Sequence, residues 1–126
     1  MDAVAYVVAA AMLGVAAFHV VVAGGAPLGR FTQGGRHETA LPRAGRIVAV
    51  VSAGLVLLMA VVVLARVDRG PATVRDADWI DWAWWATVAY LTVGVVANAA
   101  SRSRSERLLW TPIVAALLVL TLMSGL

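Results

Sequence analysis

Two polar side chains, those of His19 and Asn98, interrupt long apolar runs of this chain. An imidazole within a membrane segment can relay protons, bind a metal or gate a path, because an ionisable group is costly to bury there. An asparagine commonly hydrogen-bonds to a second helix, which contributes about 1 kcal/mol or less. The alternative for His19 is structural: a neutral imidazole hydrogen-bonded to a neighbouring helix or loop. If the two side chains face each other, they line a polar pocket that opens at the cytoplasmic side.

Neither a metal site nor a cofactor is expected. His37 is the only other histidine, and the chain has no cysteine that could supply a thiolate ligand. His37, Glu38 and Glu106 could act as acids or bases, but no spacing in the sequence pairs them.

Residues 24–38 combine five glycines with Arg30, Arg36, His37 and Glu38. Glycines let backbone N–H groups approach an anion closely, and arginine binds phosphate or carboxylate bidentately. Arg30, Arg36, His37 and Arg43 are therefore candidate ligands for a lipid headgroup or a phosphorylated molecule. The stretch lacks the G-x-x-x-x-G-K-[ST] pattern of a phosphate-binding loop. A structured interfacial loop that contacts anionic lipid is the simpler interpretation.

Four apolar segments must position these residues: 4–23, 47–65, 80–100 and 108–126. Each has roughly the 17–25 residues that cross a hydrocarbon core about 30 Å thick. The chain is 62% apolar and only 13% charged, whereas soluble domains carry about 25% charged residues. The sequence therefore predicts an all-α fold, a bundle of four transmembrane helices that forms a single integral membrane domain over residues 1–126.

The charges between the segments predict the orientation in the membrane. Loop one (24–46) and loop three (101–107) together hold seven arginines, and loop two (66–79) holds three. Basic residues concentrate on the cytoplasmic side, so we expect loops one and three in the cytoplasm and both termini outside. The same rule explains the pI near 10.6, so a nucleic-acid partner is not expected. Residues 1–3 lack the basic region of a cleavable signal, and we expect the first segment to be retained.

Local signals predict where the helices begin and end. Gly24-Gly25 followed by Pro27 is expected to end the first helix, and Pro42 to lie in the first turn of the second. Ser103 and Glu106 have the spacing of a capping box, which predicts that the fourth helix begins there and that Pro112 bends it.

Five tryptophans gather near the ends of the segments. Trp79, Trp82, Trp84 and Trp85 lie where loop two enters the third segment, and Trp110 lies at the start of the fourth. Indole rings favour the headgroup region, so an aromatic belt at each interface is expected.

Two stretches carry a family resemblance: Gly25-Ala26-Pro27-Leu28-Gly29 with Gly34-Gly35-Arg36-His37 and Leu41-Pro42, and Asn98-x-x-Ser101-Arg102-Ser103 with Glu106-Arg107 and Thr111-Pro112. In these the chain resembles a group of small bacterial four-span integral membrane proteins of unassigned function. The resemblance implies a four-helix protein of the bacterial cytoplasmic membrane and supplies no activity.

Three functional hypotheses follow. The leading one is a non-catalytic accessory or scaffold protein that contacts anionic lipids at the cytoplasmic face and a membrane-protein partner. The alternative is a small oligomeric transporter or channel, in which His19 and Asn98 line a cytoplasm-facing polar path. The third is an enzyme or binder that acts on an anionic lipid headgroup through the loop-one arginines.

Overall fold

The computed structural model describes residues 2–126, and this part of the chain is helical, with no strand. Four helices are long and apolar enough to cross a membrane, which confirms the predicted all-α, multi-pass architecture. They are α1 (Asp2–Ala23), α2 (Arg43–Arg66), α4 (Ile80–Ala99) and α5 (Arg104–Gly125). Three short helical turns lie in the loops: η1 (Gly29–Phe31), η2 (Gln33–Gly35) and α3 (Ala72–Arg75).

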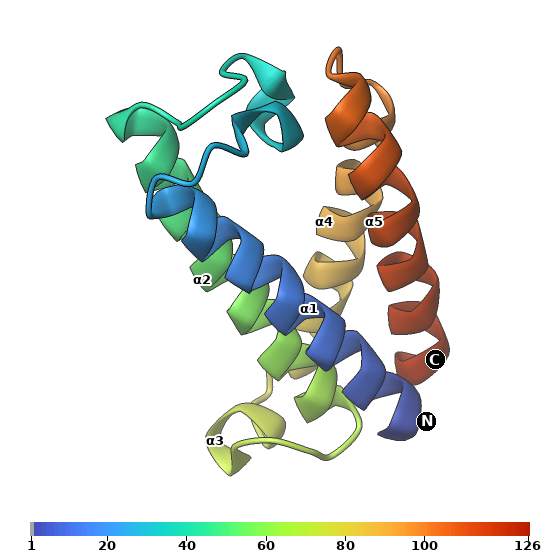
Figure 1. Cartoon of the computed structure of the whole chain (residues 1–126). Coiled ribbons are helices and arrows are strands. Elements are labelled where there is room, and N and C mark those ends of the chain that lie inside the picture. The colour runs from blue at the N-terminus through green and yellow to red at the C-terminus, as the bar shows by residue number, and fades with distance from the viewer. Residues whose placement is uncertain (1) are drawn as a thin grey trace.

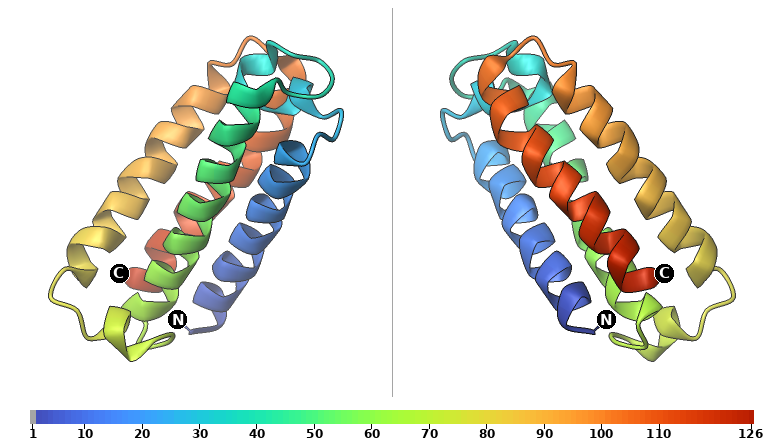
Figure 2. Two further views of the ribbon diagram at one scale, coloured as in Figure 1. Left: turned by 90° about the vertical axis from the view of Figure 1, so that its left-hand side faces the viewer. Right: turned by 90° about the vertical axis from the view of Figure 1, so that its right-hand side faces the viewer.

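The long helices form two antiparallel hairpins, α1 with α2 and α4 with α5 (Figure 1). The hairpins also contact each other, α1 against α5 and α2 against α4. Both termini lie at the end of the bundle that carries α3, here called the loop-two end (Figure 2). Loops one and three share the opposite, loop-one end. The ribbons of α2 and α4 diverge toward that end in Figure 1.

A core of buried side chains from all four long helices joins the hairpins, and most of it lies on α1 and α2. Ala5, Val8, Met12 and Val63 are completely buried. Small residues let the backbones of membrane helices approach closely, and van der Waals packing then holds them together. Many large apolar side chains instead face outward, as expected where lipid is the solvent.

Three helices begin earlier than the apolar segments: α1 at Asp2, α2 at Arg43 and α5 at Arg104 rather than at residues 4, 47 and 108. The backbone hydrogen bonds of a helix do not depend on apolar side chains, and long arginine side chains can extend toward water from the helix end. Loop one is thus residues 24–42 and loop three residues 100–103. The prediction for Pro42 was wrong in detail: it precedes α2 as its N-cap and does not lie in the first turn.

The predicted end of α1 and start of α5 are confirmed. Gly25 has a φ of +104°; its N–H donates to Val22 and that of Ala26 donates to Val21, which is the pattern of a glycine-terminated helix. At α5, the Ser103 hydroxyl accepts a hydrogen bond from the Glu106 N–H at 3.2 Å. Pro112 lies inside α5.

The tryptophans divide into exposed and buried groups. Trp79, Trp82 and Trp85 recur every third residue and are exposed at the loop-two end, in agreement with an aromatic belt. The belt prediction was wrong for Trp84, which is completely buried and packs against Val62 and Val88. A helix turns by about 100° per residue, so Trp84 points into the bundle when its neighbours point out.

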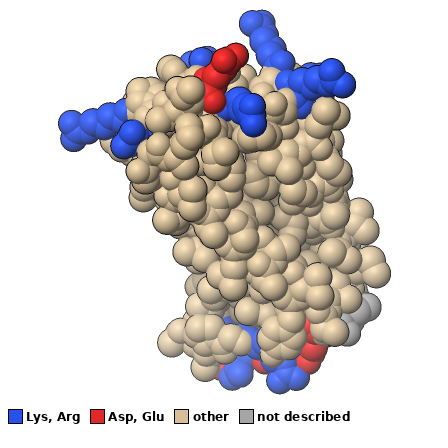
Figure 3. All heavy atoms as spheres, in the orientation of Figure 1, with Lys and Arg blue, Asp and Glu red and all other residues tan. Residues whose placement is uncertain are grey.

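Charged side chains gather at the two ends of the molecule, and an uncharged band separates them on the face drawn in Figure 3. This distribution is the one that a bilayer imposes, because a charge at membrane depth is costly.

Candidate functional site

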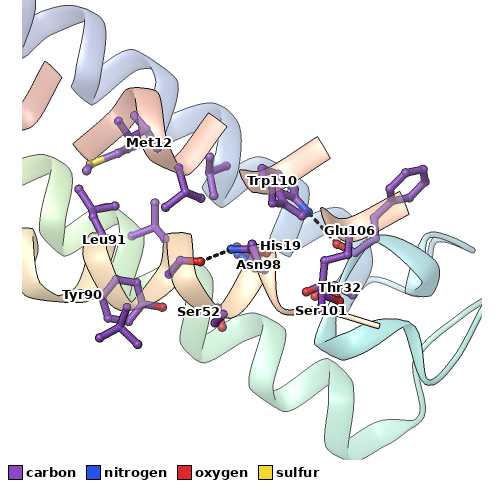
Figure 4. A pocket seen from close by; sticks show the side chains of 18 of the residues that line it. Met12, His19, Thr32, Ser52, Tyr90, Leu91, Asn98, Ser101, Glu106 and Trp110 are labelled. Carbon is purple, nitrogen blue, oxygen red and sulfur yellow. Dashed lines mark hydrogen bonds between the residues drawn. The ribbon is translucent and has the colours of Figure 1, made fainter. Parts of the chain in front are cut away.

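A cavity of about 460 Å³ lies between the two hairpins, in the half of the bundle nearer the loop-one end. We call it the inter-hairpin cavity. Every long helix contributes to its wall, for example through His19 of α1, Ser52 of α2, Asn98 of α4 and Trp110 of α5 (Figure 4). Its volume lies in the range of about 300–1,000 Å³ that is typical of small-molecule sites.

The cavity is amphipathic along its length. At one end its wall is mainly apolar, with Tyr90 as the polar exception (Figure 4), and most of it belongs to the central core or packs against it: Met12, Met59, Leu91, Val114 and Leu117. At the other end it is polar and lies against loops one and three: His19, Thr32, Asn98, Ser101 and Glu106. Figure 4 shows Met12 and Leu91 on one side of the view and Thr32, Ser101 and Glu106 on the other.

His19 and Asn98 line this one cavity, as the sequence led us to consider. His19 is half-buried and stacks edge-on against Phe18, the preceding residue of its own helix. The expected bond from Asn98 to another helix is not formed in the part of the chain that the structure describes. Its amide instead donates to the Gly94 carbonyl of its own helix at 2.7 Å, a local bond that polar side chains readily make inside helices.

Glu106 connects the cavity to loop one. One carboxylate oxygen, Oε2, accepts hydrogen bonds from the Gly34 N–H at 2.9 Å and the Ser101 hydroxyl at 2.8 Å. In a full capping box this carboxylate would turn back to the N–H of Ser103, but that N–H donates to the Ser101 hydroxyl. The sequence pattern therefore concealed a cavity residue, because it assigned the carboxylate to the helix cap.

Loop one is held over the polar end by further bonds. The Trp110 indole N–H donates to the Phe31 carbonyl at 2.6 Å, and the Ser103 hydroxyl donates to the Arg30 carbonyl. Trp110 is half-buried near the loop-one end and ties loop one to α5. Gly35 has a φ of +68°, and a Cβ there would lie 2.5 Å from the Ser103 Cβ. Only glycine fits this contact between loops one and three.

The arginines predicted to bind anions do not all gather in one place. Arg30 lines a surface depression of about 750 Å³ with Arg102 and Arg104, which come from loop three and the first residue of α5. We call this the arginine hollow; Glu38 also lines it. Arg36, His37 and Arg43 are exposed and do not line it. From the sequence, loop three contributes only to the predicted orientation, because no local signal shows that it meets loop one.

Ion pairs distinguish the two ends of the bundle. Among residues 2–126, the three salt bridges all lie at the loop-two end: Arg66–Asp81, Arg69–Asp2 and Arg75–Asp76. The hydrogen bond from Arg75 lowers the pKa of Asp76, and the bond to Asp2 raises the pKa of Arg69. The seven arginines at the loop-one end have no carboxylate within 4.0 Å in the described chain.

The described residues contain no group of three potential metal ligands. Comparison with known proteins adds no further assignment: no protein-family model, no curated protein and no solved structure matches the chain.

Proposed function

We propose that this chain is a non-catalytic, multi-pass protein of the bacterial cytoplasmic membrane that binds a membrane-soluble amphipathic small molecule in the inter-hairpin cavity. The observation that carries this proposal is the division of the cavity into an apolar end and a polar end. A ligand with a polar head and an apolar body matches such a cavity, as the few polar groups of a binding site fix orientation while its apolar walls exclude water.

The position of the cavity supports access from within the bilayer. Ser52 of α2 lines it together with Tyr90, Val93 and Ala97 of α4. Tyr90 is 45% and Val93 is 67% exposed, so the wall between α2 and α4 is formed partly by surface residues. Both helices are long and apolar enough to span the membrane, and their surface at this depth would face lipid. A ligand dissolved in the bilayer could therefore enter sideways between them.

The charges support an orientation with loops one and three in the cytoplasm and both termini outside. Within residues 2–126, the three arginines at the loop-two end are paired with aspartates, and the seven at the loop-one end are not. Unpaired arginines near the surface favour anionic lipid by about 1 kcal/mol each, which suits the cytoplasmic leaflet. The resemblance to small bacterial four-span proteins supports the choice of membrane.

Binding accounts for the geometry better than catalysis on a lipid headgroup does. Of the four residues expected to bind a lipid headgroup, Arg30 lines the arginine hollow, whereas Arg36, His37 and Arg43 do not. A scaffold role, with a membrane-protein partner or a second copy of the chain, is compatible with the proposal. The mass spectrometry experiment described next would also detect such a partner.

The test compares two neighbouring positions of α2. Ser52→Phe fills the inter-hairpin cavity, whereas Val51→Phe places the same ring on the outward face, where Val51 is 64% exposed. Native mass spectrometry of protein extracted gently from its host membrane should show a small-molecule adduct on the unmodified chain and on Val51→Phe, but not on Ser52→Phe. Equal adducts on both variants would overturn the proposal. A protein retained at fixed stoichiometry would identify a partner.

Transport is a second candidate, because His19 and Asn98 line the same cavity at its polar end. The loop-two half of the bundle is filled by completely buried side chains such as Val8, Val63 and Trp84, so transport would require that half to open. Proteoliposomes that contain a pH-sensitive dye should then show proton flux that His19→Ala abolishes. Unchanged flux in the folded variant would remove His19 from the mechanism.

A further inference from the structure

We infer that the ligand of the inter-hairpin cavity is a lipophilic organic cation, and that the Glu106 carboxylate is its counter-charge. This inference rests on the proposed binding function and deepens it by naming the chemical class of the ligand.

Glu106 is the only carboxylate among the described residues that line the cavity, and no arginine lines it. Although seven arginines lie at the same end of the bundle, none forms a salt bridge with Glu106 in the described chain. Its Oε2 accepts two hydrogen bonds, and its Oε1 accepts none from residues 2–126. A cation that binds within about 4–6 Å of a half-buried carboxylate favours its ionised form.

The face of α5 that lines the cavity changes from charged to aromatic to aliphatic. Glu106, Trp110, Val114 and Leu117 follow one another at intervals of three or four residues and all line the cavity. Residues at this spacing share one face of a helix. With a rise of 1.5 Å per residue, the stripe from Glu106 to Leu117 is about 16 Å long. This length accommodates a lipophilic cation, with its charge toward Glu106 and its apolar groups against Val114 and Leu117.

Trp110 adds a second attraction for a cation. Its indole N–H is already bonded to the Phe31 carbonyl, and the Phe18 ring packs against it with the centroids 4.8 Å apart. The part of the ring system that lines the cavity is therefore what a ligand can contact. Indole faces attract cations, by about 0.5–1 kcal/mol when exposed and about 2 kcal/mol or more when desolvated. An anionic head would instead meet the Glu106 charge with no arginine in the wall to offset it.

The experiment uses two ions of nearly equal size and shape but opposite charge, tetraphenylphosphonium and tetraphenylborate. Equilibrium binding of each to the purified full chain in a neutral detergent is measured by dialysis. We expect saturable phosphonium binding and much weaker borate binding. Glu106→Gln, which keeps an acceptor for Gly34 and Ser101, should weaken phosphonium binding at least about tenfold and remove the preference for the cation. Glu38→Gln is the control, since Glu38 does not line this cavity.

The outcomes separate the two proposals. If Ser52→Phe abolishes phosphonium binding but Glu106→Gln does not change it, the cavity binds ligands and the inference about charge is wrong. If phosphonium binds and Ser52→Phe has no effect relative to Val51→Phe, the cavity is not the site and the proposed function fails. The comparison of the two ions uses the unmodified chain, so its result does not depend on whether a variant folds. Equal or tighter binding of borate, or binding of neither ion, would overturn the inference.

Discussion

The backbone N–H of Gly34 donates a hydrogen bond to the carboxylate of Glu106 at 2.9 Å, across 72 residues of sequence. This contact joins loop one to the first turn of α5 at the polar end of the inter-hairpin cavity. The same carboxylate accepts from Ser101, so one side chain holds loops one and three together. Loops one and three, which are far apart in the sequence, are thereby joined at one end of the bundle.

Ser103 is expected to contribute more to stability than its neighbour Ser105. The Ser103 hydroxyl caps α5 and also donates to the Arg30 carbonyl, whereas the Ser105 hydroxyl makes no hydrogen bond in the described chain. Ser103→Ala should lower the free energy of unfolding by about 1–2 kcal/mol, as the loss of a helix cap does. SDS titration in mixed micelles measures this change. If Ser105→Ala changed the free energy of unfolding equally, the cap and the loop contact made by Ser103 would contribute nothing measurable to stability.

Alanine should have opposite effects at two glycines. Gly35→Ala places a Cβ against Ser103 at a positive φ, and we expect a loss of about 1–3 kcal/mol in unfolding free energy from overpacking and backbone strain. Gly54 lies inside α2 with nothing within 4 Å of its Cβ position. Gly54→Ala should therefore be neutral or stabilising by up to about 1 kcal/mol. Thermal unfolding of both variants in detergent checks the signs, and a stable Gly35→Ala would contradict the observed loop contact.

The Trp110 indole N–H should keep loop one closed. Trp110→Phe retains an aromatic ring but removes the bond to the Phe31 carbonyl, which should cost about 1 kcal/mol. We expect faster hydrogen exchange in peptides of loop one, measured by mass spectrometry, with little change in α2. Trp85→Phe, at an exposed position, is the matched control. Unchanged exchange in loop one would mean that the other loop contacts suffice.

The orientation can be tested because the chain has no native cysteine. Thr39→Cys lies in loop one and Thr73→Cys in loop two, both at exposed positions. A membrane-impermeant maleimide should label Thr73→Cys in intact cells and Thr39→Cys only in inverted membrane vesicles, because the loop with more unpaired arginine faces the cytoplasm. The reverse labelling would show that the predicted orientation is inverted.

The helices could be predicted from the sequence because their causes are local. A bilayer requires every backbone polar group to be bonded within the segment, so long apolar runs must be helices. The ends at Gly25 and Ser103 followed from residues within one helical turn. The start of α2 was predicted less well, because Arg43 and Arg46 extend the helix beyond the apolar run.

The site could be predicted only in part. His19 and Asn98 were conspicuous as polar residues among apolar ones, and both line the cavity. Glu106 was missed because its spacing from Ser103 explained it as a cap. Arg102 and Arg104 were missed as partners of Arg30, because nothing in the order of residues shows that loops one and three meet.

By itself, the sequence determined the number of membrane helices, the sites where most of them end and the unequal division of arginines between the two ends. Only the tertiary structure decided which faces meet, and hence that Trp84 is buried and that Glu106 borders a cavity. The physical reason is that lipid is as apolar as the protein interior. When both faces of a helix are apolar, its sequence does not show which face contacts another helix and which faces lipid. The contacts between residues far apart in the sequence are therefore known only from the tertiary structure.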